Sequence, residues 1–117
     1  LGLAPAVISL VLLHRMTPRG ASRTFLDGEV FDGAAAAAYG LVSEAVPGDE
    51  LAARADAVCA SLLAGSAQGQ AETKRLLNAR LLADLDARRD EVAATSARLF
   101  GSDAAREAMQ AFLSRRR

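Results

Sequence analysis

The strongest constraint on the fold is a surplus of small and unbranched apolar side chains. Apolar residues make up 51% of the 117-residue chain, much of this alanine and leucine, whereas aromatic residues make up 4% and tryptophan is absent. This mixture favours helices that pack closely through small side chains over a sheet rich in β-branched residues. A chain of this length can form one domain with a usable core. We therefore predict a mostly α-helical structure.

Prolines, glycines and capping residues mark short helices in the first part of the chain. Pro5 fits the first turn of a helix whose apolar residues extend most of the way round. We expect another segment or another subunit to cover this helix. Thr17, followed by Pro18, predicts the N-cap of a second helix that ends at Gly28.

The rest of the chain continues this pattern, with one short interruption. Asp32 predicts the cap of a third short helix through 34–38, and Gly40 stops it. Residues 41–46 then predict a short extended segment, which Pro47 ends. The remainder predicts four helices separated by turns: 50–64, 67–82, 85–100 and one that Ser102 can cap.

The charge balance and the single cysteine exclude several classes of protein. Fourteen basic and fourteen acidic residues give a net charge of zero, which favours neither nucleic acid nor an anionic membrane as partner. No apolar stretch approaches the ~20 residues that cross a bilayer. Cys59 alone forms no internal disulfide and fits a reducing compartment. Its alanine-rich surroundings predict a small core residue.

The chain carries few groups that could perform chemistry. His14 is the only histidine, so no histidine-based metal site is expected, and its position predicts a helix C-terminal dipole partner or a packed surface residue. No glycine-rich phosphate loop is present. Acidic residues are interleaved with arginines over residues 84–91, which predicts a solvated helix face: Asp84, Asp86, Arg88, Arg89, Asp90 and Glu91.

Two places stand out as candidate sites. The residues from Gly2 to Ala6 predict a tight turn leading into a helix, where free amides can hold a water, an oxyanion or a phosphate. The alternative is a plain helix entry. Near the other end, Phe112 stands three residues before Arg115, so both lie on one helix face where they could meet a nucleotide base and its phosphate. The alternative there is a cationic cap on the helix dipole.

An ordered set of short motifs resembles the second half of the enoyl-CoA hydratase/isomerase (crotonase) family. No single motif is specific, but the order and spacing cover essentially the whole chain. The motifs are Gly2-Leu3-Ala4-Pro5, Thr17-Pro18-Arg19-Gly20-Ala21-Ser22-Arg23, Leu26-Asp27-Gly28, Phe31-Asp32-Gly33-Ala34-Ala35, Tyr39-Gly40-Leu41-Val42, Val46-Pro47, Lys74, Ser102-Asp103 with Glu107, and Ala111-Phe112-Leu113-Ser114-Arg115-Arg116.

The resemblance implies the C-terminal part of an α/β spiral of ββα units followed by a helical trimerisation region. Residues 1–48 would end the crotonase core with short helices and a short strand, and residues 49–117 would form the helical oligomerisation region. The resemblance further implies a cytoplasmic homo-trimer or hexamer of fatty acid metabolism that binds an acyl-CoA thioester and uses no separate cofactor, since coenzyme A is part of the substrate.

The resemblance also implies roles for three residues. The backbone amide of Ala6, where relatives commonly have glycine, would help to hold the catalytic water. Phe112 and Arg115 would meet the adenine and phosphate of CoA, and arginine in place of the commoner lysine keeps the charge. The family's two catalytic glutamates and its oxyanion hole fall outside this chain, so we expect the chain alone to be inactive. We also expect the isolated chain to be marginally stable, because its first helix would expose a broad apolar face.

Several functions remain open at this stage. The first is an enoyl-CoA hydratase, a lyase that adds water to a 2-enoyl-CoA; an enoyl-CoA isomerase and a methylglutaconyl-CoA hydratase are variants. The second is a non-catalytic helical oligomerisation module. A DNA-binding helical domain is disfavoured because acidic residues are mixed among the basic ones.

Overall fold

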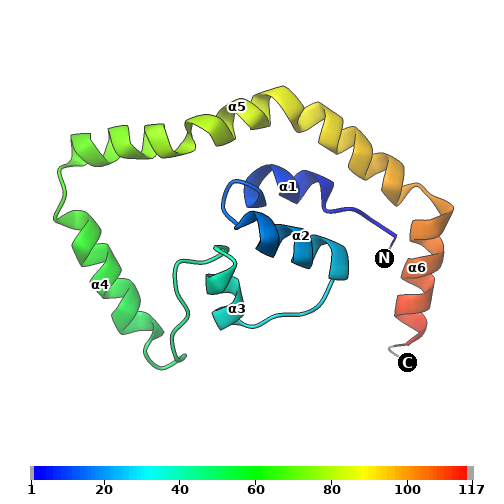
Figure 1. Ribbon diagram of the computed structural model, residues 1–117, viewed down its shortest axis with the longest axis horizontal. Helices are drawn as coiled ribbons and strands as arrows, with labels where there is room; N and C mark the ends of the chain where they lie inside the picture. Colours follow the sequence, from blue (N-terminus) through cyan, green and yellow to red (C-terminus); the bar gives the residue numbers. More distant parts are fainter. Residues whose placement is uncertain (1, 116–117) are drawn as a thin grey trace.

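The computed structural model describes residues 2–115, and over this range it consists of six α-helices and their connections. The first three helices lie at the centre, and the last three form an arch around them (Figure 1). The predicted mostly helical fold is confirmed. The helices are α1 (Ala6–Leu12), α2 (Pro18–Asp27), α3 (Gly33–Ala38), α4 (Leu51–Leu63), α5 (Ala67–Phe100) and α6 (Asp103–Ser114).

Short-range hydrogen bonds explain where the helices begin and end. Thr17 Oγ1 accepts from the Gly20 amide at 3.2 Å, and Asp32 Oδ1 accepts from the Ala35 amide at 2.9 Å. Each side chain satisfies one amide that its helix leaves without an internal acceptor. Gly28 ends α2 with a φ of 65°, a left-handed conformation that costs glycine little. The predicted caps are confirmed.

The predicted division of 67–100 into two helices is wrong. Residues 67–100 form the single 34-residue helix α5. The link at 82–85 contains neither glycine nor proline, so nothing stops the backbone hydrogen-bond ladder there. At 1.5 Å per residue, α5 is about 51 Å long, which accounts for the 53 Å longest extent of the molecule.

The segment 41–46 forms no β-strand. Residues 41–43 are bends and residues 44–46 are irregular, and no strand occurs anywhere in residues 2–115. A strand needs a neighbouring strand to receive its amides and carbonyls, and this part of the chain offers none. The segment is held instead by side chains: Arg54 Nε on α4 donates to both carboxylate oxygens of Glu44 at 2.8 Å.

The helices enclose only a small core. The buried apolar residues include Leu10 of α1, Val92 of α5 and Ala105 of α6, with Ala105 fully buried. The accessible surface is 9137 Å², whereas a compact protein of 12.2 kDa exposes about 6,000 Å². The radius of gyration is 18.5 Å, against about 13 Å for a compact chain of this length. Roughly 3,000 Å² of surface is therefore available for contacts with other polypeptide.

Helix α4 lies on the surface of the molecule along its whole length. The prediction that Cys59 is a core residue is wrong, because its side chain is exposed on α4. Helix α4 has no buried residue, so the apolar sequence neighbours of Cys59 are themselves exposed and do not cover it. Within residues 2–115, no helix is both long and apolar enough to cross a membrane.

Candidate functional site

The turn before α1 has the tight geometry predicted for it. Pro5 has φ −76° and ψ 53°, and the Ala6 amide donates to the Ala4 carbonyl at 2.8 Å. This is a three-residue inverse γ-turn, which places Ala6 as the first residue of α1. The Ala6 amide is therefore already engaged and would have to share its hydrogen with a bound water. Val7 and Ile8 supply the next first-turn amides, which the helix itself leaves without acceptors.

The segment before this turn lies against the start of α6. Gly2 has a φ of 66°, and a Cβ added there would lie 2.9 Å from the Ala104 carbonyl oxygen. Glycine is thus required both by the backbone conformation and by the close approach. Figure 1 shows the chain running from its N-terminal end, beside α6, into α1. The Ala6 turn and α6 consequently belong to one packed unit.

Phe112 and Arg115 lie at the far end of α6. Phe112 is 49% exposed and Arg115, the C-cap residue of α6, is exposed. Their three-residue spacing corresponds to neighbouring positions on one side of a helix. Ten residues separate Arg115 from Ala105 at the start of α6, which corresponds to about 15 Å along the helix axis. The two predicted sites therefore lie toward opposite ends of α6.

The single histidine pairs with an acidic residue that the sequence placed on a solvated face. His14 Nε2 lies 2.9 Å from Asp84 Oδ2, and the two side chains are 25% and 45% exposed. His14 follows the end of α1, so its prediction as a packed surface residue fits. The partner was missed because 70 residues separate them in sequence. The charged residues 88–91 of α5 form surface pairs with one another, Arg88–Glu91 at 3.7 Å and Arg89–Asp90 at 3.8 Å.

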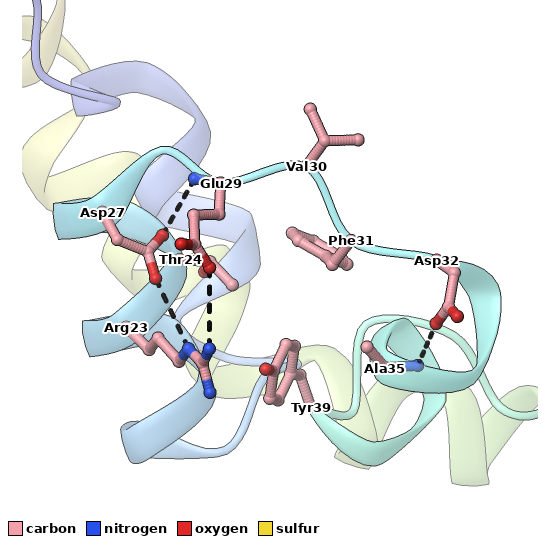
Figure 2. A pocket seen from close by; sticks show the side chains of 9 residues that line it. All are labelled: Arg23, Thr24, Asp27, Glu29, Val30, Phe31, Asp32, Ala35 and Tyr39. Carbon is pink, nitrogen blue, oxygen red and sulfur yellow. Dashed lines mark hydrogen bonds and ion pairs between the residues drawn. The ribbon is translucent and has the colours of Figure 1, made fainter.

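A polar hollow of about 300 Å³ lies between α2 and α3 (Figure 2). Arg23 Nε lies 3.4 Å from Asp27 Oδ2, and its Nη2 lies 3.6 Å from Glu29 Oε2. Phe31 meets Tyr39 edge to face, with ring centroids 5.6 Å apart. The pKa of Arg23 is raised, first by the charge of Tyr39 and then by its hydrogen bond to Asp27 and the charges of Glu29 and Asp27. Arg23 is a cation like any arginine, and its exposed pairs with Asp27 and Glu29 join the end of α2 to the connection that leads to α3.

Sequence reasoning did not single out this hollow. The four-residue spacing of Arg23 and Asp27 was a usable signal, because side chains so spaced meet on a helix. Glu29 and Tyr39 come near Arg23 only when the connection between α2 and α3 is folded. No group of three or more histidine, cysteine or acidic side chains in residues 2–115 is arranged to hold a metal ion.

Comparison with known proteins gives the class to which this fold belongs. The enoyl-CoA hydratase/isomerase family model matches residues 1–117. The chain is a member of the enoyl-CoA hydratase/isomerase family, and its fold is the helical C-terminal part of the crotonase fold. No protein with a curated description matches it.

Two solved structures are similar to the chain over nearly its whole length. One is an enoyl-CoA hydratase from Mycobacterium avium, and the other is a putative enoyl-CoA hydratase from Mycobacterium avium paratuberculosis K-10. Each is 43% identical to the chain with a TM-score of 0.92, and each match covers 97% of this chain and 45% of the solved one. The chain thus spans a little less than half the length of these structures.

Proposed function

We propose that the chain forms part of an enoyl-CoA hydratase that adds water, in syn fashion, across the 2,3 double bond of a 2-enoyl-CoA thioester. The observation that carries this proposal is the 43% identity, over 97% of the chain, to structures described as enoyl-CoA hydratases. The Ala6 turn supports it, because α1 leaves its first-turn amides without acceptors inside the helix, and the resemblance implies that one such amide holds the water.

In this mechanism the chain binds and orients, and carboxylates from elsewhere in the enzyme move the protons. The amide at Ala6 donates to the oxygen of the attacking water. Water oxygen bonds to C3 while C2 receives a proton, and the thioester carbonyl carries negative charge in between. Phe112 packs against the adenine of CoA, and Arg115 pairs with a phosphate. CoA is part of the substrate, and no further cofactor is required.

The proposed assembly is a cytoplasmic homo-trimer or hexamer. The surface of 9137 Å² supports association, because its excess of roughly 3,000 Å² over a compact chain exceeds the ~800 Å² that one standard interface buries per partner. The same observation favours the second candidate, a non-catalytic helical oligomerisation module. Isomerisation of the double bond and hydration of a methylglutaconyl-type substrate remain variants of the first.

A hydration assay separates these candidates. The protein as produced from its own gene is mixed with crotonyl-CoA, and the loss of enoyl absorbance is followed together with the oligomeric state. Hydration supports the hydratase, migration of a double bond supports the isomerase, and an inactive oligomer supports the non-catalytic module. Arg115→Ala and Phe112→Ala are expected to raise KM for the CoA substrate.

The role of the Ala6 amide has its own variant. Ala6→Pro removes the N–H at the first helical position together with its hydrogen bond to the Ala4 carbonyl, and is expected to lower kcat by about 100-fold. Ala6→Ser keeps the amide and is the matched control. Equal activity of the two variants would remove Ala6 from the mechanism.

A further inference from the structure

A basic hollow lies where the turn after α1 meets α5. It has a volume of about 240 Å³, and its lining includes His14 and Arg15 of the turn and Arg80 of α5, together with an asparagine and leucines of α5. None of the described residues that line it is acidic. Over residues 74–80, α5 carries three cations and no acidic residue, although the chain as a whole is neutral. Positive charge is therefore concentrated locally around this hollow.

The two arginines of the hollow are not neutralised by carboxylates of the described chain. Arg15 Nη2 donates to Asn78 Oδ1 at 3.3 Å, which is a neutral acceptor. Asn78 Nδ2 donates in turn to the Lys74 carbonyl at 2.9 Å, so the asparagine is held with its oxygen toward Arg15. Arg80 forms no ion pair with any acidic residue of 2–115. Two guanidiniums thus line one hollow while both retain donors for an anion.

The acidic residue best placed to neutralise Arg80 is engaged elsewhere. Asp84 follows Arg80 by four residues on α5, a spacing at which an arginine and an aspartate often pair on a helix. Asp84 Oδ2 instead lies 2.9 Å from His14 Nε2. The turn after α1 therefore has two effects on the hollow. It adds the charge of Arg15, and through His14 it occupies the carboxylate that would otherwise compensate Arg80.

We propose that Arg15 and Arg80 form a binding site for a phosphate group. A guanidinium presents a rigid fork of donors that suits phosphate oxygens. Two guanidiniums from different segments suit a tetrahedral anion, which has oxygens on several sides. A carboxylate has two oxygens in one plane, which one guanidinium can satisfy. The site is separate from Arg115, the C-cap residue of α6, and does not rest on the proposed function.

Calorimetric titration with inorganic phosphate tests the site in the protein as produced from its own gene, at a constant ionic strength of about 0.1 M. Saturable binding of one phosphate per chain is expected. Arg15→Gln and Arg80→Gln should each weaken binding about 10-fold, because each removes charge-assisted hydrogen bonds. Asp84→Asn should strengthen binding about 3-fold, because it removes a negative charge beside Arg80. His14→Ala should weaken binding, since it releases Asp84 to pair with Arg80.

Two arginines outside the hollow provide matched controls. Arg75 lies on the same helix and pairs with Glu72 at 2.8 Å, and Arg115 ends α6. Arg75→Gln and Arg115→Gln should each change the affinity less than 2-fold, and thermal unfolding checks that every variant is folded. Equal weakening by Arg75→Gln and Arg80→Gln would overturn the proposal, because the attraction would then be general to α5. Absence of binding to the folded wild type, or equally tight binding of acetate, would also overturn it.

Titration with CoA identifies where the phosphate group comes from. If CoA displaces inorganic phosphate and Arg80→Gln weakens CoA binding, the site holds a phosphate of the substrate. If CoA leaves the bound phosphate in place, the site holds free phosphate or another phosphoester; both results support the site. A wild-type protein that hydrates no enoyl-CoA but binds phosphate through Arg80 would overturn the proposed function and leave this inference standing.

Discussion

The packed corner of α1, α5 and α6 differs sharply from the open limb formed by α4. In the corner, Leu10 is 4% exposed and Val92 is 6% exposed. On α4, Leu51 is 62% exposed and Leu62 is 59% exposed, and no residue of the helix is buried. All four are large aliphatic residues in helices. Their different burial therefore reflects which neighbours the described chain supplies, not the side chains themselves.

The open limb nevertheless carries the sequence pattern of a covered helix. Leu51, Ala55, Val58 and Leu62 are spaced by four, three and four residues, which places them on one face of α4. Three of them line a hollow of about 520 Å³ beside the 42–46 segment. An exposed aliphatic stripe of this kind is typical of a surface that another polypeptide covers. The corner is stabilised within the chain, whereas the limb is expected to be stabilised by assembly.

The largest expected effect comes from truncating the buried leucine of the corner. Leu10→Ala removes a side chain that is 4% exposed and should lower the free energy of unfolding by about 2–4 kcal/mol. Leu63→Ala on the limb, where the leucine is 82% exposed, should change it by less than about 0.5 kcal/mol. Denaturant unfolding followed by circular dichroism measures both. Equal losses would mean that α4 is covered in solution.

Glycine-to-alanine substitutions compare a glycine that packs closely against the chain with one in open space. Gly40 has a φ of 78°, and an added Cβ would lie 2.9 Å from the Arg15 carbonyl oxygen, so Gly40→Ala should cost about 2–3 kcal/mol. Gly28 has a φ of 65° in open space, so Gly28→Ala should cost about 1 kcal/mol from the backbone alone. Gly48→Ala has neither penalty and is the control. A ranking in which Gly28 costs more than Gly40 would contradict the close approach.

Cap residues test whether stability is shared between the two regions. Thr17 caps α2 near the corner and Ser66 caps α5 at its junction with α4, each through one amide at 3.2 Å and 3.1 Å. Replacing either by alanine should cost about 1 kcal/mol. Hydrogen exchange should show global loss of protection for Thr17→Ala but faster exchange only around 64–70 for Ser66→Ala. Global loss from both would show that the limb folds together with the corner.

Local features of this fold were predictable because their causes lie within a few residues. The caps at Thr17 and Asp32 depend on amides three residues away, and the stop at Gly28 depends on one backbone angle. The turn at Ala6 was likewise predictable, although its hydrogen bond to the Ala4 carbonyl was not. Sequence spacing also predicts one helix face for Phe112 and Arg115, which lie at the C-terminal end of α6.

Features that depend on distant partners were not predictable. His14 meets Asp84 across 70 residues, and no local pattern distinguishes Asp84 from its acidic neighbours. The exposure of Cys59 follows from what α4 lacks as a neighbour, which composition does not encode. The distance between the two candidate sites depends on how α1 packs on α5 and how Gly2 approaches the start of α6. It is therefore a property of the fold that no single motif contains.

The smallest expected effect lies in the ion pair that ties the limb to the preceding segment. Arg54 donates to both oxygens of Glu44 at 2.8 Å, and the hydrogen bond and charge of Glu44 raise the pKa of Arg54. An arginine guanidinium stays protonated around neutral pH, so ionic strength is the variable that tests this pair. Since both side chains are about half exposed, at 49% and 40%, screening should remove most of the attraction.

Arg54→Gln is therefore expected to lower the thermal midpoint slightly at low ionic strength and not at all at about 1 M salt, where the Debye length is about 3 Å. Glu44→Gln should behave in the same way, and the double variant should lose no more than either single one. A loss that persists at high salt would show that Arg54 acts through packing of its aliphatic stem on the limb. Such a result would mean that contacts within the chain, and not assembly alone, stabilise part of the limb.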